Sequence, residues 1–185
     1  MPITPHRWMR PATSLTLSLF ALTACTSPQP TPIPSSTPEV IFASEEEALA
    51  AVTATFETYQ ALSYTILAEG GSNPERLAAI ATPDVTEVEY AGYRMAAEGG
   101  YSFTGTPSIA SITLVFWLAN PDPLSVLARA EICIDITDVQ VTDSTGASAV
   151  NVERRNLSRW SVDFSEGNDE ALIVSAKDLL DGECR

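Results

Sequence analysis

The chain has 185 residues, 24 of them acidic and 10 basic, and its formal net charge is −14. An acidic surface repels nucleic acid and anionic lipid headgroups, which excludes nucleic acid as an expected partner. The single histidine, His6, lies near the start of the chain.

The first 24 residues have the order of a secretory signal peptide. Arg7 and Arg10 supply positive charge before a run of apolar and small residues over 12–24. That run is about 13 residues long, against the roughly 20 that a bilayer span needs. We therefore expect 1–24 to be a cleaved signal peptide rather than a transmembrane helix.

Leu22-Thr23-Ala24-Cys25 closes this segment. It resembles the lipobox of bacterial lipoproteins, which is leucine, a small residue, alanine or glycine, and cysteine. The resemblance implies a diacylglyceryl group on the Cys25 sulfur and Cys25 as the first residue after cleavage. An ordinary signal peptide with an incidental cysteine is the alternative. Because each buried acyl carbon contributes roughly 0.8 kcal/mol, two or three chains would anchor the protein without a basic patch.

Residues 25–43 are rich in Pro, Ser and Thr, a composition that favours extended polyproline II and builds no core. We expect a disordered stalk that carries one domain over 44–185, a size sufficient for one core. Without the signal peptide, 24 acids face eight bases, a charge of about −16.

With Cys25 in the anchor, Cys133 and Cys184 are the two cysteines left. Disulfides persist in the compartments to which exported chains go, and one pair allows one connectivity. We predict a Cys133–Cys184 disulfide that closes a loop of about 52 residues and holds the C-terminal end. Two free buried thiols are the alternative.

Three helices are predicted next. Ser44 and Glu47 can form a capping box, and apolar residues then recur at helical spacing until Gly70-Gly71, which predicts a helix over 45–68. Asn73-Pro74 starts a short helix.

Thr82-Pro83 starts a third helix, which ends at Gly99-Gly100. Gly92 lies inside it, where glycine costs stability, so we expect a close packing contact at Gly92.

Beyond Gly100 the apolar residues alternate. Strands are predicted over four segments and a short earlier one: 109–118, 128–137, 156–164, 171–177 and 101–103. In the first long strand, Ile112, Leu114, Phe116 and Leu118 are expected to share one face, opposite Trp117. Short connections favour antiparallel pairing, and helices followed by strands indicate an α+β fold.

This order of elements resembles the cone-shaped nuclear transport factor 2-like fold of SnoaL-like polyketide cyclases and ketosteroid isomerases. The chain also resembles lipoproteins of high-GC Gram-positive bacteria that carry such a domain on a Pro/Thr stalk. In those proteins a Cys-x-Asp in a central strand pairs with a cysteine near the C-terminus, and the matching residues are Cys133-Ile134-Asp135 and Cys184. The resemblance covers 44–184 and implies three helices packed on a curved sheet of four to five strands.

Carboxylates and tyrosines are the catalytic groups that remain once His6 is removed and both thiols are paired. Ketosteroid isomerases use an aspartate base and a tyrosine donor, which makes Tyr59 and Tyr93 the pocket candidates here. Core aromatic residues are the alternative interpretation. We assign no catalytic residue and expect no cofactor.

Two charged clusters allow more than one interpretation. Asp135, Asp138 and Asp143 lack EF-hand spacing and are expected to be a solvated strand end rather than a metal site. A set of arginines either pairs with carboxylates across strands or forms a docking patch for an acidic partner: Arg154, Arg155 and Arg159.

The strand at 128–137 bears on catalysis. Isoleucines recur at every second position from Ile132, and burial favours that they face the helices. Glu131 and Asp135 would then face outward with Cys133, so this strand would contribute no proton-exchanging acid to the interior. We therefore expect a lipid-anchored, non-catalytic binding module for an envelope protein or a small apolar ligand. Two alternatives stay open: a small isomerase, cyclase or hydrolase with a Tyr–carboxylate pair, and an envelope chaperone or spacer.

Overall fold

The computed structural model of the protein describes residues 42–119, 126–167 and 171–184. The predicted signal peptide, Cys25 and nearly all of the 25–43 linker lie outside the described residues. Within the described ranges, no helix is long and apolar enough to cross a membrane.

The helices are α1 (Glu45–Ala68), the 3-10 helix η1 (Pro74–Ala79) and α2 (Pro83–Glu98). The predicted capping box begins α1: the Ser44 hydroxyl accepts a hydrogen bond from the Glu47 N–H at 3.2 Å, and the Glu47 carboxylate accepts one from the Ala43 N–H at 2.8 Å. All three helices were predicted close to their observed bounds.

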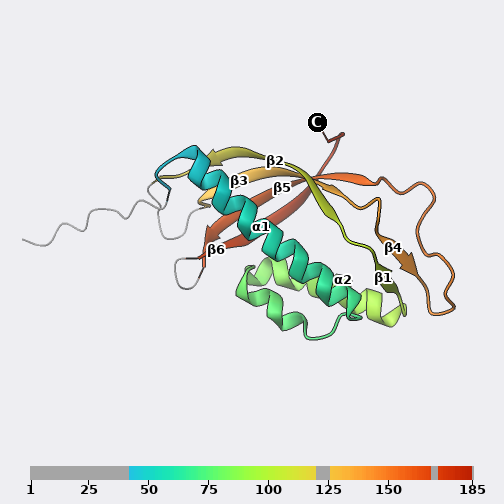
Figure 1. The fold of residues 1–185 in the computed structure, drawn as a ribbon. Coiled ribbons are helices and arrows are strands. Elements are labelled where there is room, and N and C mark those ends of the chain that lie inside the picture. The colour runs from blue at the N-terminus through green and yellow to red at the C-terminus, as the bar shows by residue number, and fades with distance from the viewer. Residues whose placement is uncertain (1–41, 120–125, 168–170, 185) are drawn as a thin grey trace, which may run out of the picture. The chain divides into compact units, whose positions relative to one another are not determined.

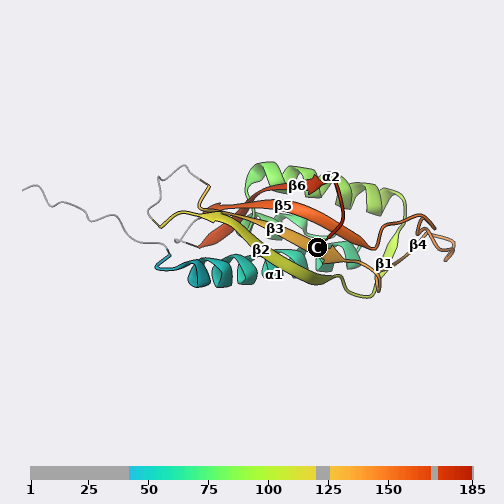
Figure 2. The ribbon, with the colours of Figure 1, turned by 90° about the horizontal axis from the view of Figure 1, so that it is seen from above.

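Four strands form an antiparallel sheet in the order β2-β3-β5-β6, with β2 (Ser108–Trp117), β3 (Ala128–Asp135), β5 (Leu157–Glu166) and β6 (Leu172–Leu180). A separate two-stranded sheet pairs β1 (Ser102–Thr104) with β4 (Gln140–Thr142), a strand that was not predicted. Figures 1 and 2 show α1 and α2 on one face of the larger sheet. The α+β class is confirmed, whereas the cone shape stays a prediction.

The core fills the space between this sheet face and the helices. Its largest fully buried side chains come from both layers: Phe56, Tyr59, Ile66, Leu77, Ile132, Val162, Phe164 and Val174. Burial of this much apolar surface is the main stabilising contribution to the fold.

A bulge in β2 changes the predicted face of its aromatic residues. Leu114 lies opposite Ala130 and Phe116 opposite Arg129, so Val115 is an extra residue. Beyond the bulge Trp117 packs on the core, whereas Phe116 lies on the outer face, 5.6 Å below the Arg129 guanidinium. The prediction that Phe116 shares a face with Ile112 was wrong, because one inserted residue reverses the alternation.

The expectation for Gly92 was also wrong. A Cβ built at this position would have nothing within 4 Å, so no close contact accounts for the glycine.

The outer face of β3 follows the predicted alternation. Ile132 is fully buried on the helix side, whereas Glu131 pairs with Arg159 and the Asp135 carboxylate accepts hydrogen bonds from Thr137. These partners leave both acids half-buried rather than largely exposed. Cys133 lies between them at disulfide distance from Cys184, with the two Cα atoms 5.7 Å apart.

We predict that thiol titration of the unfolded, unreduced Cys25→Ser chain finds no free thiol. Closure of a loop of about 52 residues should contribute about 4 kcal/mol at most, so a reductant should lower the midpoint of chemical unfolding. Two titratable thiols would contradict a Cys133–Cys184 bond.

Candidate functional site

A buried polar network joins α1, α2 and β6. The Tyr59 hydroxyl donates a hydrogen bond to Glu89 Oε1 at 2.6 Å, and Lys177 Nζ donates one to the Tyr59 hydroxyl oxygen at 3.1 Å. Lys177 also forms an ion pair with Glu89. Only 20% of the Lys177 side chain and 15% of the Glu89 side chain are exposed. Each charge therefore needs the other to compensate for the loss of its contacts with water.

Aromatic rings complete the surroundings of the Lys177 ammonium. Its Nζ lies 5.2 Å from the centroid of the Tyr59 ring and 5.0 Å from that of the Trp160 ring. The negative faces of such rings attract a cation, and more strongly where water is excluded. Lys177 is the single lysine of the chain, a signal for a special position that sequence reasoning missed.

A second bulge turns Lys177 inward. Asp163 lies opposite Ala176 and Phe164 opposite Val174, so Ser175 is the extra residue in β6. Val174 and Lys177 therefore both face the helices. The Thr82 N–H donates to the Val174 carbonyl at 2.9 Å, and the Val174 N–H donates to the Ile80 carbonyl at 3.0 Å, which braces the bulge.

Burial holds both predicted pocket tyrosines in their neutral form. Burial, reinforced by the negative charge of Glu89, raises the pKa of Tyr59 far above its ordinary value. Burial raises the pKa of Tyr93 to about 12, although its hydrogen bond to the Ser63 hydroxyl acts in the opposite direction. The structure thus brings Tyr59 to a carboxylate, Glu89, that was not predicted as a site residue.

The Tyr59 hydroxyl of this Tyr–carboxylate pair is occupied, although Glu89 and Lys177 also line a cavity of about 210 Å³. Tyr59 is 2% exposed, its hydroxyl is engaged by Glu89 and Lys177, and the charge of Glu89 is compensated by Lys177. General acid–base catalysis requires a group within hydrogen-bond reach of the substrate. The network has the geometry of a structural clamp between three elements.

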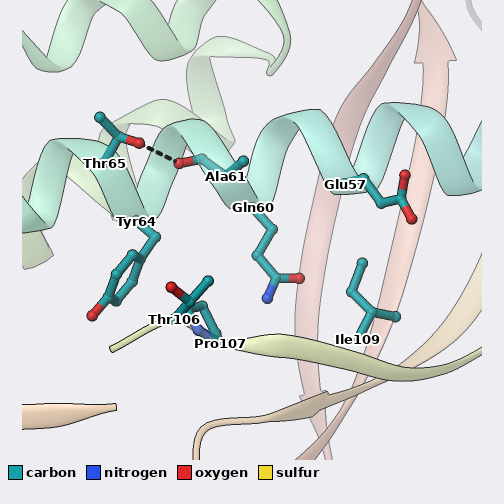
Figure 3. Close-up of a pocket in the computed structure, with 8 residues that line it drawn as sticks. All are labelled: Glu57, Gln60, Ala61, Tyr64, Thr65, Thr106, Pro107 and Ile109. Carbon is teal, nitrogen blue, oxygen red and sulfur yellow. Dashed lines mark hydrogen bonds between the residues drawn. The ribbon is translucent and has the colours of Figure 1, made fainter. Parts of the chain in front are cut away.

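An open groove of about 440 Å³ lies beside α1, on the side of the start of β2 (Figure 3). Eight residues line it: Glu57, Gln60, Ala61, Tyr64, Thr65, Thr106, Pro107 and Ile109. Figure 3 shows the Gln60 and Tyr64 side chains extending from α1 toward the Thr106–Pro107 backbone.

The groove combines hydrogen-bond acceptors with apolar surface. Gln60 Oε1 and the Tyr64 hydroxyl are buried and have no hydrogen-bond partner among the described residues, whereas the Thr65 hydroxyl donates to the Ala61 carbonyl at 2.7 Å. Of the lining residues that the structure describes, Glu57 is the one with a formal charge. Unpartnered buried oxygens are costly, so a ligand donor that reached them after a rearrangement of the two side chains would gain free energy.

The three predicted docking arginines do not lie on one strand, because β5 begins at Leu157, beyond Arg154 and Arg155. The Arg154 guanidinium donates to the carbonyls of Ile136 and Val139 at 3.1 and 3.0 Å. Arg159 pairs with Glu131 across the strands, which was the alternative interpretation. Arg155 is the member of the set that stays exposed.

The aspartates of the strand ends organise turns. The carboxylates of Asp135 and Asp143 accept hydrogen bonds from Thr137 and Thr145, and these bonds lower the pKa of each aspartate. Among the described residues, no three His, Cys, Asp or Glu side chains gather in a way that could hold a metal ion.

No family model and no curated protein matches the chain. Among solved structures, the intermembrane space region of the chloroplast protein ARC6 is 11% identical over 72% of this chain and 97% of that one, with a TM-score of 0.48. A Catenulispora acidiphila protein is 15% identical over 72% and 93%, with a TM-score of 0.46. A Catenulispora acidiphila structure in complex with S-DNPA is 16% identical over 70% and 92%, with a TM-score of 0.45. At such identities the likeness concerns the fold alone.

We predict that Lys177→Met lowers the free energy of unfolding by about 3 kcal/mol, because Glu89 would be left as an uncompensated buried charge. Arg159→Met is the matched control. It removes an ion pair whose side chains are 29% and 38% exposed, and should cost less than about 1 kcal/mol. Chemical denaturation measures both, and equal losses would contradict a clamp at Lys177.

Stability should fall between pH 10 and pH 12. An unfolded tyrosine loses its proton near pH 10, whereas folded Tyr93 keeps its proton until about pH 12. The folded state then binds more protons, so the unfolding free energy decreases as the pH rises. The measurement is denaturant unfolding across this range, where Tyr93→Phe should flatten the decline. An unchanged slope in Tyr93→Phe would contradict a buried, neutral Tyr93.

Proposed function

We propose that the protein is a non-catalytic binding module that a lipid on Cys25 holds at the outer face of the cell membrane. Its binding site in this proposal is the groove between α1 and β2. One contrast carries the proposal: the Tyr59 hydroxyl and Glu89 are already paired with each other and with Lys177, whereas two oxygens beside the groove have no partner among the described residues.

The chemistry of the groove favours a small, largely apolar organic cation. Ala61, Pro107 and Ile109 offer apolar surface, and Gln60 Oε1 and the Tyr64 hydroxyl oxygen can each accept a donor. Among the described residues the lining contains one carboxylate, Glu57, and no basic side chain. Glu57 and the acidic domain around it attract a positive charge, and the Tyr64 ring can add a cation–π contact.

The alternative of a small isomerase, cyclase or hydrolase is disfavoured by the same contrast. Such an enzyme needs a Tyr–carboxylate pair that meets its substrate, and here the hydroxyl of Tyr59 is already occupied. The spacer alternative gains no specific support.

The location part of the proposal depends on the sequence. The basic residues Arg7 and Arg10, the short apolar run and the lipobox-like Leu22-Thr23-Ala24-Cys25 together support export and lipid attachment. Membership of the nuclear transport factor 2-like group is part of the same proposal, supported by the order of helices and strands.

Groove binding is tested by titrating the full chain with benzylammonium and following backbone amide NMR signals. The signals of Gln60, Tyr64 and Ile109 should shift, and Ala61→Phe, which fills the groove, should abolish the shifts. Ala54→Phe places the same side chain on an exposed α1 position outside the groove and should bind normally. Benzyl alcohol, which lacks the charge, should bind more weakly. Equal effects of the two alanine variants would overturn the site.

The anchor is tested by Cys25→Ser and cell fractionation. The unaltered chain should sediment with membranes and the variant should be released to the soluble fraction. A variant that stays in the membrane fraction would contradict lipid attachment at Cys25.

A further inference from the structure

The outer surface of α2 exposes two large apolar side chains. Val88 is 71% exposed and Met95 is 67% exposed, and seven residues separate them, so they lie on the same side of the helix two turns apart. Ala91 and Gly92 lie on the turn between them, and a Cβ at Gly92 would find open space. These four residues form what we call the α2 stripe.

The α2 stripe is apolar although it faces solvent, which distinguishes it from the apolar side of α2 that packs on the core. The other side of the helix is buried in the fold through Val85, Tyr93 and Ala96. A solvent-facing helix surface normally carries polar residues, and glycine inside a helix costs about 1 kcal/mol relative to alanine. Neither Val88 nor Met95 contributes to the core, and the glycine relieves no crowding within the chain. A surface with these properties fits close approach by another helix.

Two opposite charges run along one border of the stripe. Glu87 and Arg94 are both exposed. Seven residues separate them, as seven separate Val88 and Met95, so the two charges also lie two turns apart on one side of the helix. Among the described residues neither forms an ion pair. The negative charge lies toward the N-terminal end of α2 and the positive charge toward its C-terminal end.

We propose that α2 packs antiparallel on α2 of a second copy of this chain. A two-fold axis near Ala91 places Val88 against Met95 of the other copy. The same axis places Glu87 beside Arg94 of the other copy, and it does so twice because the interface is self-complementary. In a parallel arrangement Glu87 and Arg94 of the two copies would lie at different heights and could not pair, so the charge pattern favours a second copy in the antiparallel orientation.

The size of the stripe limits the strength of this contact. One face of a 16-residue helix buries far less than the roughly 1,200 Å² of a stable interface. The association should therefore be weak and reversible, and strongest where the chain is concentrated.

Cysteine cross-linking in membranes of cells that express the full chain tests the contact. Ala91→Cys places a thiol beside the axis and should give a covalent dimer on a non-reducing gel. Ala97→Cys is the matched control, because Ala97 is exposed but lies about 200° around the helix axis from Met95 and should not cross-link.

Charge reversal then decides whether the orientation is right. In the Ala91→Cys chain, either Glu87→Arg or Arg94→Glu should reduce the dimer about tenfold, and the double exchange should restore it. Three outcomes would overturn the proposal. They are equal cross-linking of Ala97→Cys, an Ala91→Cys adduct whose mass differs from twice that of the chain, and failure of the double exchange to restore the dimer.

Discussion

A buried ion pair, Glu89 with Lys177, connects the helices to the last strand and occupies the polar groups at their junction. Both charges are largely removed from water, so each requires the other, and the Tyr59 hydroxyl supplies the remaining hydrogen bond. Because Lys177 comes from β6, Glu89 from α2 and Tyr59 from α1, the network fixes how these elements meet. It also occupies the Tyr59 hydroxyl, the group that would have to meet a substrate for acid–base chemistry. Beside the groove along α1, by contrast, Gln60 Oε1 and the Tyr64 hydroxyl have no hydrogen-bond partner among the described residues.

The bulges at Val115 and Ser175 determine whether Trp117 and Lys177 reach that interior. The extra residue Val115 turns Trp117 onto the core and leaves Phe116 under Arg129 on the outer face. The extra residue Ser175 turns Lys177 inward to meet Glu89. A one-residue insertion reverses the faces of all that follow it, so each bulge has consequences along its strand. In β3, by contrast, side chains alternate strictly between the two faces. The ion pairs Glu131–Arg159 and Arg129–Asp163 lie on its outer face with Cys133.

The helices were predictable because their signals are local: the Ser44 cap, the Asn73-Pro74 and Thr82-Pro83 starts and the glycine stops lie within a few residues of each end. The alternation of β3 was also a clear signal, and it predicted that Cys133 lies on the outer face of the sheet. The bulges left no local signal, and β4 has only three residues. The clamp was missed because Tyr59, Glu89 and Lys177 are far apart in sequence, although the single lysine within an alternating strand was a signal that pattern reading alone could have used.

The central claim is that Tyr59, Glu89 and Lys177 form a structural clamp rather than an active site. Proton NMR of the folded chain tests it most directly, through the hydroxyl proton of Tyr59 assigned by comparison with Tyr59→Phe. Tyr59 as a residue is 2% exposed, and its hydroxyl donates to Glu89, so the hydroxyl proton should exchange slowly with water and give a resolved signal at neutral pH. A Tyr59 hydroxyl that exchanges as fast as that of an exposed tyrosine would show that water, and hence a substrate, reaches the pair, and would contradict the account.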